Sequence, residues 1–308
     1  MRNAFISQLN ELAQKEESLV LLAGDIGIKV FDKFRDSYPD RFFNCGIAEA
    51  NMVGMSAGLA MAGFRPFVYT IIPFLTMRAF EQIRVDLCMH NQPVILVGVG
   101  GGLAYDVLGP THHAIEDVAI MRALPNMTVI VPSDPEEVKQ AIIEAYALKK
   151  PVYIRLGKNG EPQLTNNSYL DFKIGRARIL REGRDVAIIG CGPILKIALD
   201  AAEILMAQGL SCQVVDMHTI KPLDAHQIVE TGHKVRAMIT IEEHNVIGGL
   251  GSAVSEVISE NNLNLSFKRF GLKDAFVLDV GNQKYLLEKA KLTSKIIVDW
   301  LASKILQI

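Results

Sequence analysis

Residues 127–137 read MTVIVPSDPEE. The stretch starts as an apolar, β-branched run, which is typical of a buried strand. Ser133 then offers a hydroxyl as a helix cap, Pro135 stands early in the next turn, and two glutamates follow, so we expect a helix to begin at once. A buried strand that passes directly into a helix is the repeating unit of a parallel sheet. This stretch therefore predicts the α/β class.

The same alternation of strands and helices extends in both directions from this stretch. The expected strands are short apolar runs at 18–24, 65–71, 93–100, 127–133 and 151–156. The expected helices have helical apolar spacing and cover 2–15, 48–62, 76–90, 115–123 and 134–149. This order predicts a mostly parallel sheet that helices cover on both faces.

A polar segment, GKNGEPQLTNNSYLDF at 157–172, separates a second and shorter series. Further strands are expected at 185–192, 211–217 and 236–244, with helices at 194–208, at 252–261 and from about 293. We therefore expect two α/β domains, at 1–160 and 173–308, joined by a linker at 161–172. Each should be a mostly parallel sheet covered by helices.

Composition excludes several classes of protein. The net charge of −2 over 308 residues offers no basic stripe for nucleic acid. The four cysteines form no C-x-x-C pair, so neither a disulfide framework nor a zinc site is indicated. The charge-poor stretches 50–64 and 91–105 are too short, or too rich in Gly and Pro, to span a membrane. We expect a cytoplasmic protein with reduced thiols.

Glu49 is the only charged residue between Arg41 and Arg65. It stands in the segment NCGIAEANMVGMSAGLAMAGF at 44–64, which is rich in Gly, Ala and Met. A carboxylate in apolar surroundings is costly unless it has a hydrogen-bonding partner. The segment itself contains no partner of opposite charge, so the bonding partner of Glu49 has to come from elsewhere.

After Glu49, small residues recur at a spacing of four, at Ala50, Gly54, Gly58 and Ala62. We call these four residues the small-residue ridge. Such a ridge lets another backbone approach one side of a helix closely. Since Gly costs about 1 kcal/mol inside a helix, a close contact should compensate. Contact with another subunit and packing on the chain's own sheet explain the ridge equally well.

Two further groups of polar residues are candidates for ligand binding. The loop GPTHHAIED at 109–117 places His112 and His113 where they could face a ligand, although a loop histidine is more often merely solvated. Arg155 closes a strand, and Arg78 stands early on a charge-poor helix. Either could pair with a phosphate, with a surface ion pair as the ordinary alternative.

Three separated blocks of sequence, in the right order, carry a family resemblance. They are FFNCGIAEANMVGMSAGLAMAG, GPTHHAIEDVAIMRALPNMTVIVPSD, and the set DVAIIGCG, VVDMHTIKPLD and EEHNVIGGLGSAV. Together they resemble the C-terminal two-thirds of the transketolase family. That family includes 1-deoxyxylulose-5-phosphate synthase and, more distantly, the beta subunits of 2-oxoacid dehydrogenase E1 components.

The resemblance implies thiamine diphosphate as the cofactor and a partner for Glu49. The matching acid of the family bonds to N1′ of the cofactor's aminopyrimidine. That bond favours the imino tautomer, which removes the C2 proton of the thiazolium and generates the ylid that acts as an electron sink. Phe74 is expected to stack on the pyrimidine, with Leu75 as the competing position.

On the substrate side, the resemblance implies that His112 contacts substrate oxygens and helps to stabilise charge on the bound carbonyl. Arg155 matches an arginine that binds the substrate phosphate, and Arg78 resembles one used by the deoxyxylulose synthases. Two positions depart from the family pattern: Leu108 replaces an aspartate that reads a sugar hydroxyl, and a polar residue, often His, would fall near Gly100. Both departures concern the substrate, so the resemblance identifies the cofactor chemistry and not the donor sugar.

The family binds the diphosphate through a metal held by a G-D-G motif and a later Asn-Asn pair, on a separate N-terminal domain. The nearest match here is GDIG at 24–27, and Asn166 and Asn167 lie in the linker, far from it. No metal ligand is therefore expected on this chain. The resemblance implies an N-terminal partner subunit that holds Mg²⁺ or Ca²⁺, in a heterotetramer with two copies of each chain.

The function expected from these features is that of the C-terminal subunit of a split transketolase, active only with its partner. It would transfer a two-carbon ketol unit from a ketose (phosphate) donor to an aldose acceptor through the thiamine diphosphate ylid. Three alternatives stay open: a beta-type E1 subunit of a 2-oxoacid dehydrogenase, an enzyme like 1-deoxyxylulose-5-phosphate synthase, and a non-catalytic partner that only completes a dimer.

Overall fold

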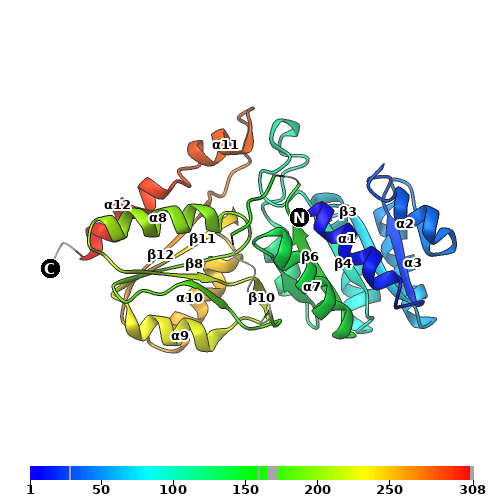
Figure 1. The fold of residues 1–308 in the computed structure, drawn as a ribbon, viewed down its shortest axis with the longest axis horizontal. Coiled ribbons are helices and arrows are strands. Elements are labelled where there is room, and N and C mark those ends of the chain that lie inside the picture. Colours follow the sequence, from blue (N-terminus) through cyan, green and yellow to red (C-terminus); the bar gives the residue numbers. More distant parts are fainter. Residues whose placement is uncertain (28, 159, 165–171, 306–308) are drawn as a thin grey trace.

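The structure is a computed structural model and describes residues 1–27, 29–158, 160–164 and 172–305. Two sheets, each flanked by helices, lie side by side along the long axis of the molecule (Figure 1). Both are mostly parallel, so the predicted α/β class with two covered sheets is confirmed. Asn166 and Asn167, named above as part of the linker, lie outside the described residues.

The first sheet has seven strands in the order β10-β5-β6-β4-β3-β1-β2. These strands are β1 (Leu19–Ala23), β2 (Phe42–Asn44), β3 (Arg65–Ile71), β4 (Ile95–Val99), β5 (Thr128–Ile130), β6 (Val152–Leu156) and β10 (Thr219–Lys221). The five strands expected from apolar runs are all present, because those runs are buried on both faces. Strand β10 joins antiparallel to β5 from the second half of the chain.

The helices of the first half follow the predicted order, with two short helices, Asp32–Ser37 and Ile72–Thr76, that were not predicted. The helices are α1 (Arg2–Ala13), α2 (Asp32–Ser37), α3 (Glu49–Met61), α4 (Ile72–Thr76), α5 (Phe80–Gln82), a π-helix (Ile83–Met89), α6 (Asp117–Ala123) and α7 (Pro135–Ala147), with 3₁₀ turns at Pro39–Arg41 and Asp106–Leu108. The single helix expected over 76–90 is instead divided between α5 and the π-helix.

The cap of α7 also differs from the expected one. Asp134, not Ser133, accepts hydrogen bonds from the backbone N–H groups of Glu136 at 3.0 Å and Glu137 at 2.9 Å. The hydroxyl of Ser133 donates instead to Asp216 at 2.7 Å, across to the second half of the chain. A carboxylate competes well for this position because it is negatively charged at the positive end of the helix.

The second sheet has five strands in the order β12-β11-β8-β9-β7. Its elements are β7 (Arg178–Arg181), β8 (Val186–Gly190), β9 (Cys212–Asp216), β11 (Ala237–Asn245) and β12 (Ser266–Leu272), with α8 (Leu195–Ala207), α9 (Ala225–Lys234), α10 (Leu250–Glu260), α11 (Gln283–Lys289) and α12 (Ser294–Ile305). Only β7 runs antiparallel to its neighbour in this sheet. The strands β8, β9 and β11 are buried along their whole length, which explains why their sequence predicts them well.

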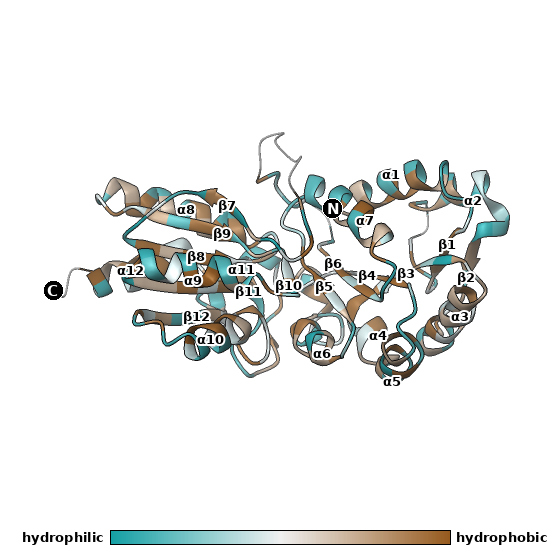
Figure 2. Ribbon diagram, turned by 90° about the horizontal axis from the view of Figure 1, so that it is seen from below, coloured by the Kyte–Doolittle hydropathy of each residue, from teal (hydrophilic) through white to brown (hydrophobic). Residues whose placement is uncertain are grey.

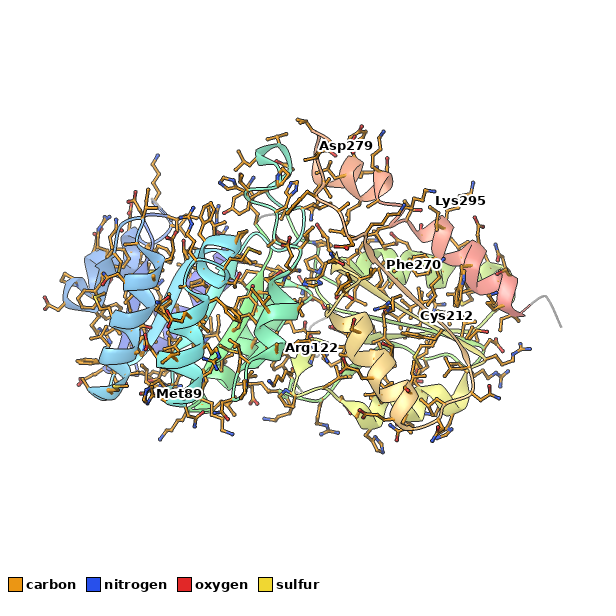
Figure 3. The ribbon with its side chains drawn as sticks, turned by 180° about the vertical axis from the view of Figure 1, so that it is seen from behind. Met89, Arg122, Cys212, Phe270, Asp279 and Lys295 are labelled. Atoms are coloured by element: carbon orange, nitrogen blue, oxygen red, sulfur yellow. The ribbon has the colours of Figure 1, made fainter. Side chains whose placement is uncertain are left out.

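The two halves are joined by direct contacts. Besides the pairing of β10 with β5, the backbone N–H of Val131 donates to the carbonyl of His218 at 2.7 Å. Arg122 on α6 forms an ion pair with Glu256 on α10 at 2.6 Å, and Figure 3 labels Arg122 at this seam. The two sheets are therefore held in one arrangement by backbone pairing and by side chains.

The outer helices of the first half carry much apolar surface. Figure 2 shows α3 mostly in apolar colours although it lies at the outer end of the molecule, and α4 and α5 lie next to it. The exposed large apolar side chains in and beside these helices are Ile47, Met61, Phe64, Met77 and Met89. In the small-residue ridge, Gly58 and Ala62 are exposed, and a Cβ added at Gly58 would meet no atom within 4 Å. The C-terminal half of the ridge is therefore exposed, whereas Ala50 packs against the core and Gly54 lies near Asp86.

No helix in the described part of the chain combines the length and the apolar character that a membrane crossing requires.

Candidate active site

Glu49 is the first residue of α3, and only 4% of it is exposed. The N-terminus of a helix favours a negative charge at this position. Its partner within the chain is Arg78, whose Nη1 lies 3.3 Å from Oε2 and 3.4 Å from Oε1. The sequence offered no partner for this carboxylate nearby; the structure brings one from 29 residues away.

Arg78 also covers the ring of Phe74. Its guanidinium carbon lies 4.0 Å from the ring centroid, a cation–π contact. The side chain of Arg78 is 51% exposed, so this contact is at the edge of the site and not in the core. Leu75 is fully buried in the hydrophobic core, whereas Phe74 is only partly buried. Of the two positions considered for the stacking residue, only Phe74 faces the site.

His112 also contacts Phe74. The two rings are 5.2 Å apart in an edge-to-face arrangement, and Tyr105 lies 5.7 Å from the imidazole. Nδ1 of His112 is 2.9 Å from the hydroxyl oxygen of Thr111. Partial burial, followed by the nearby His113 and Arg78, lowers the pKa of His112, which favours a neutral imidazole near pH 7.

His113 does not reach this cluster. It is buried, and its Nε2 lies 2.9 Å from the carbonyl oxygen of Asp106 within the same loop. The structure therefore brings together Glu49, Phe74, Arg78 and His112 and gives His113 a place inside the loop. The four residues come from three different connections between a strand and a helix.

The departures at Gly100 and Leu108 lie on the loop that carries His112. Gly100 has a φ of 92°, and a Cβ there would collide with the ring of Tyr105. Tyr105 thus occupies the space beside Gly100 and is a site residue that the sequence does not reveal. Leu108 ends the 3₁₀ turn at Asp106–Leu108 and is 50% exposed.

Arg155 has a different environment from the one predicted for a phosphate ligand. It is 6% exposed, and its Nε donates to Asp117 Oδ2 at 2.9 Å. Its Nη2 donates to the carbonyls of Ala114 at 2.8 Å and Glu243 at 3.0 Å. Burial disfavours the charged guanidinium, but the Asp117 carboxylate outweighs it and raises the pKa of Arg155 above its ordinary value. These bonds hold the guanidinium of Arg155 inside the chain.

In the described part of the chain, no three or more His, Cys, Asp or Glu side chains are grouped in a way that could hold a metal ion.

Comparison with known proteins identifies the family. The model of the transketolase pyrimidine-binding domain matches residues 1–162, and that of the transketolase C-terminal domain matches residues 175–297. The chain belongs to the transketolase family.

Similar members of the family include proteins named as transketolase subunits. The chain is 37% identical to the 6-deoxy-6-sulfo-D-fructose transketolase subunit SqwH of Clostridium sp. (strain MSTE9), over 97% of this chain and 92% of that protein. It is 36% identical to one subunit of the apulose-4-phosphate transketolase of Phocaeicola vulgatus, over 84% of each. A solved structure described as a split gene transketolase, inactive beta4 tetramer, has 39% identity and a TM-score of 0.91, and covers 99% of this chain and 98% of that one.

Transketolase family membership implies thiamine diphosphate, and the residues at the site fit its pyrimidine half. The guanidinium of Arg78 is flat and carries N–H groups; it stacks on Phe74 and bonds to Glu49 at the same time. A flat ring with nitrogen atoms can therefore satisfy both residues from one position. Phe74 would hold the face of the aminopyrimidine, and Glu49 would bond to its ring nitrogen.

A structural role for Arg155 makes a prediction about stability. Arg155→Met should lower the free energy of unfolding by about 3–5 kcal/mol, because it leaves the buried Asp117 carboxylate without its charged partner. Urea unfolding of the chain, followed by circular dichroism, measures this loss.

The double variant Asp117→Asn/Arg155→Met should lose less than Arg155→Met alone, because it no longer contains the unpaired charge. An Arg155→Met protein as stable as the wild type would contradict the structural role and make Arg155 a candidate substrate ligand again.

Proposed function

We propose that this chain is the C-terminal subunit of a split, thiamine diphosphate-dependent transketolase. With an N-terminal partner subunit it transfers a two-carbon ketol unit from a ketose donor to an aldose acceptor. The observation that carries the proposal is that Glu49, Phe74 and His112 converge on one place that fits a flat group. The guanidinium of Arg78 occupies this place here. The family match supports the same function.

When bound, thiamine diphosphate supplies an acidic carbon whose conjugate base serves as the electron sink that no side chain can provide. Glu49 holds a proton at the N1′ nitrogen of the pyrimidine. Its burial at a helix N-terminus suits this task, because water does not compete for the carboxylate there. Phe74 orients the ring by stacking. His112, with a lowered pKa, presents a neutral imidazole to the oxygens of the substrate.

Several features support a need for a partner subunit. The sequence has no G-D-G motif followed by Asn-Asn, so the metal and diphosphate are assigned to the other chain. A relative of known structure forms a beta4 tetramer described as inactive. The apolar surface of α3 to α5 and the exposed part of the small-residue ridge provide a face for assembly. We place this face at the subunit contacts of a heterotetramer with two copies of each chain.

The substrate we propose is a sugar with an anionic end. The names of two relatives specify such sugars, one with a sulfonate and one with a phosphate. Arg78 is a half-exposed cation beside Glu49 and Phe74, whereas Arg155 is buried and bonded to Asp117. When the pyrimidine binds Glu49 and Phe74, Arg78 loses both of its described partners and becomes available to the anion. Leu108 and Tyr105 lie on the His112 loop, which departs from the family pattern. We assign to them the selection of the sugar.

The acid–base role of Glu49 predicts the effect of removing only its charge. Glu49→Gln keeps the shape of the side chain but cannot exchange a proton with N1′. The variant, mixed with its partner subunit, should assemble normally and turn over on the order of a hundredfold more slowly, within the usual range for general acid–base catalysis. Hydrogen–deuterium exchange at C2 of the cofactor, followed by NMR, should slow in parallel.

His112→Ala serves as the matched comparison, since it should leave C2 exchange unchanged and weaken use of the ketose. The wild-type chain alone should show no turnover. C2 exchange at the wild-type rate in Glu49→Gln, or robust turnover by a chain shown to be free of any partner, would refute the assignment.

The position of Arg78 predicts opposite effects on cofactor and substrate. Arg78→Met removes the group that competes with the pyrimidine for Glu49 and Phe74, so cofactor binding to the assembled enzyme should tighten by about two- to fivefold, as expected for a partly exposed ion pair. The KM for an anionic ketose should rise, while that for an uncharged analogue should not. Isothermal titration calorimetry and steady-state kinetics measure the two effects.

The control is Arg84→Met, because Arg84 is exposed on the neighbouring π-helix. Weaker cofactor binding in Arg78→Met than in Arg84→Met would show that Arg78 binds the cofactor and does not compete with it.

The small-residue ridge predicts a difference between assembly and folding. Gly58→Ala and Gly58→Leu should both stabilise the isolated chain, by up to about 1 kcal/mol, because Gly58 is exposed in a helix with open space at its Cβ. Only Gly58→Leu should disrupt the complex with the partner subunit. Light scattering of the mixed subunits checks assembly. An intact complex with Gly58→Leu would show that the subunit contact does not include this ridge.

A further inference from the structure

We propose that Glu243, in the C-terminal domain, is a positioning residue that sets the place of the His112 loop through a direct hydrogen bond to its backbone. The loop is residues 100–114, between the end of β4 and α6. This inference rests on the proposed function for the role of His112, and on the contacts around Glu243 for the positioning itself.

The loop is closed at its base and braced inside. The backbones of Gly102 and Ala114 exchange two hydrogen bonds, each of 2.9 Å, and so join its two ends. Within the loop, His113 Nε2 lies 2.9 Å from the carbonyl oxygen of Asp106. Because of these bonds, the outer part of the loop, with Tyr105 and His112, depends on where the base is held.

Glu243 reaches the base from strand β11. Its Oε1 accepts a hydrogen bond from the backbone N–H of Leu103 at 2.6 Å, directly after the Gly102–Ala114 closure. A Cβ at Gly102 would collide with the side chain of Glu243, so the two segments are in close contact. A hydrogen bond from an amide to a carboxylate is among the stronger ones in proteins.

Two other residues hold Glu243 and the loop together. Gln283, at the start of α11, donates from Nε2 to both carboxylate oxygens, at 2.9 and 3.0 Å. Arg155 donates from Nη2 to the carbonyls of Ala114 and Glu243, one on each side of the junction. Figures 1 and 3 show the loop and α11 rising next to one another on the same side of the molecule. The base of the loop is therefore hydrogen-bonded to the C-terminal domain, directly through Glu243 and indirectly through Arg155.

Burial of the Glu243 carboxylate is unfavourable unless its hydrogen bonds to Leu103 and Gln283 are kept. Glu243 is 7% exposed, and burial raises its pKa. The carboxylate has no part in the chemistry assigned to Glu49 or His112. Its bonds connect the C-terminal domain to the segment that brings His112 within 5.2 Å of Phe74.

The test uses Glu243→Leu, which removes the acceptor, and Gln283→Ala, which keeps the acceptor but removes its brace. In the assembled enzyme, hydrogen–deuterium exchange of peptides covering 100–116 should accelerate about tenfold in Glu243→Leu and less in Gln283→Ala, with exchange over the first sheet unchanged. The KM for the ketose should rise by a similar factor, while kcat and cofactor C2 exchange change little. Glu243→Gln keeps an acceptor oxygen for Leu103 and should restore most of the loop protection.

Lys284→Ala, an exposed neighbour of Gln283, is the control and should match the wild type in every measurement. Unchanged exchange at 100–116 in both Glu243→Leu and Gln283→Ala would overturn the positioning role, as would a uniform loss of protection over the whole chain in Gln283→Ala. Accelerated loop exchange with an unchanged KM would overturn the link to substrate. A wild-type complex with no ketose turnover would refute the proposed function, whereas the exchange measurement would still decide the positioning.

Discussion

The ion pair between Arg155 and Asp117 is the interaction on which the rest of the structure depends. It joins the end of β6 to the start of α6, and the same guanidinium bonds to the carbonyls of Ala114 and Glu243. Tyr153 donates a further hydrogen bond to Asp117 at 2.6 Å. Two buried charges are tolerated only when each is paired and hydrogen-bonded, so the geometry allows little displacement. Arg155 thereby fixes the first sheet, the His112 loop and the second domain relative to one another.

The location of the candidate site follows from the topology of the first sheet. Glu49 follows β2, Phe74 and Arg78 follow β3, and His112 follows β4. In the order β4-β3-β1-β2, these strands are close together and parallel, so their carboxyl ends meet at one edge. Ligand sites of open parallel sheets are found at this edge. Residues more than 60 positions apart in the chain, Glu49 and His112, become neighbours of Phe74 for this reason.

The sequence predicts the buried strands and most helices well, because an apolar run is stable only where the fold buries it. It does not predict the strands β2, β7, β10 and β12, whose sequences are too short or too mixed in polarity to show a period. Site residues with a local signature, such as Glu49 and His112, can be recognised from sequence. The partners of Arg155 and Glu49 cannot, because they lie 38 and 29 residues away and only the fold brings them near. Tyr105 was missed because its place depends on the left-handed backbone at Gly100.

Strand β10 has a consequence for how the protein could be divided. It belongs to the second half of the chain but completes the edge of the first sheet beside β5. A fragment that stopped in the linker would present β5 as an unpaired edge strand, with free N–H and C=O groups ready to pair with another chain. The two halves therefore share one edge of the first sheet. A gene cut between them would yield a first fragment that is prone to associate with other chains along β5.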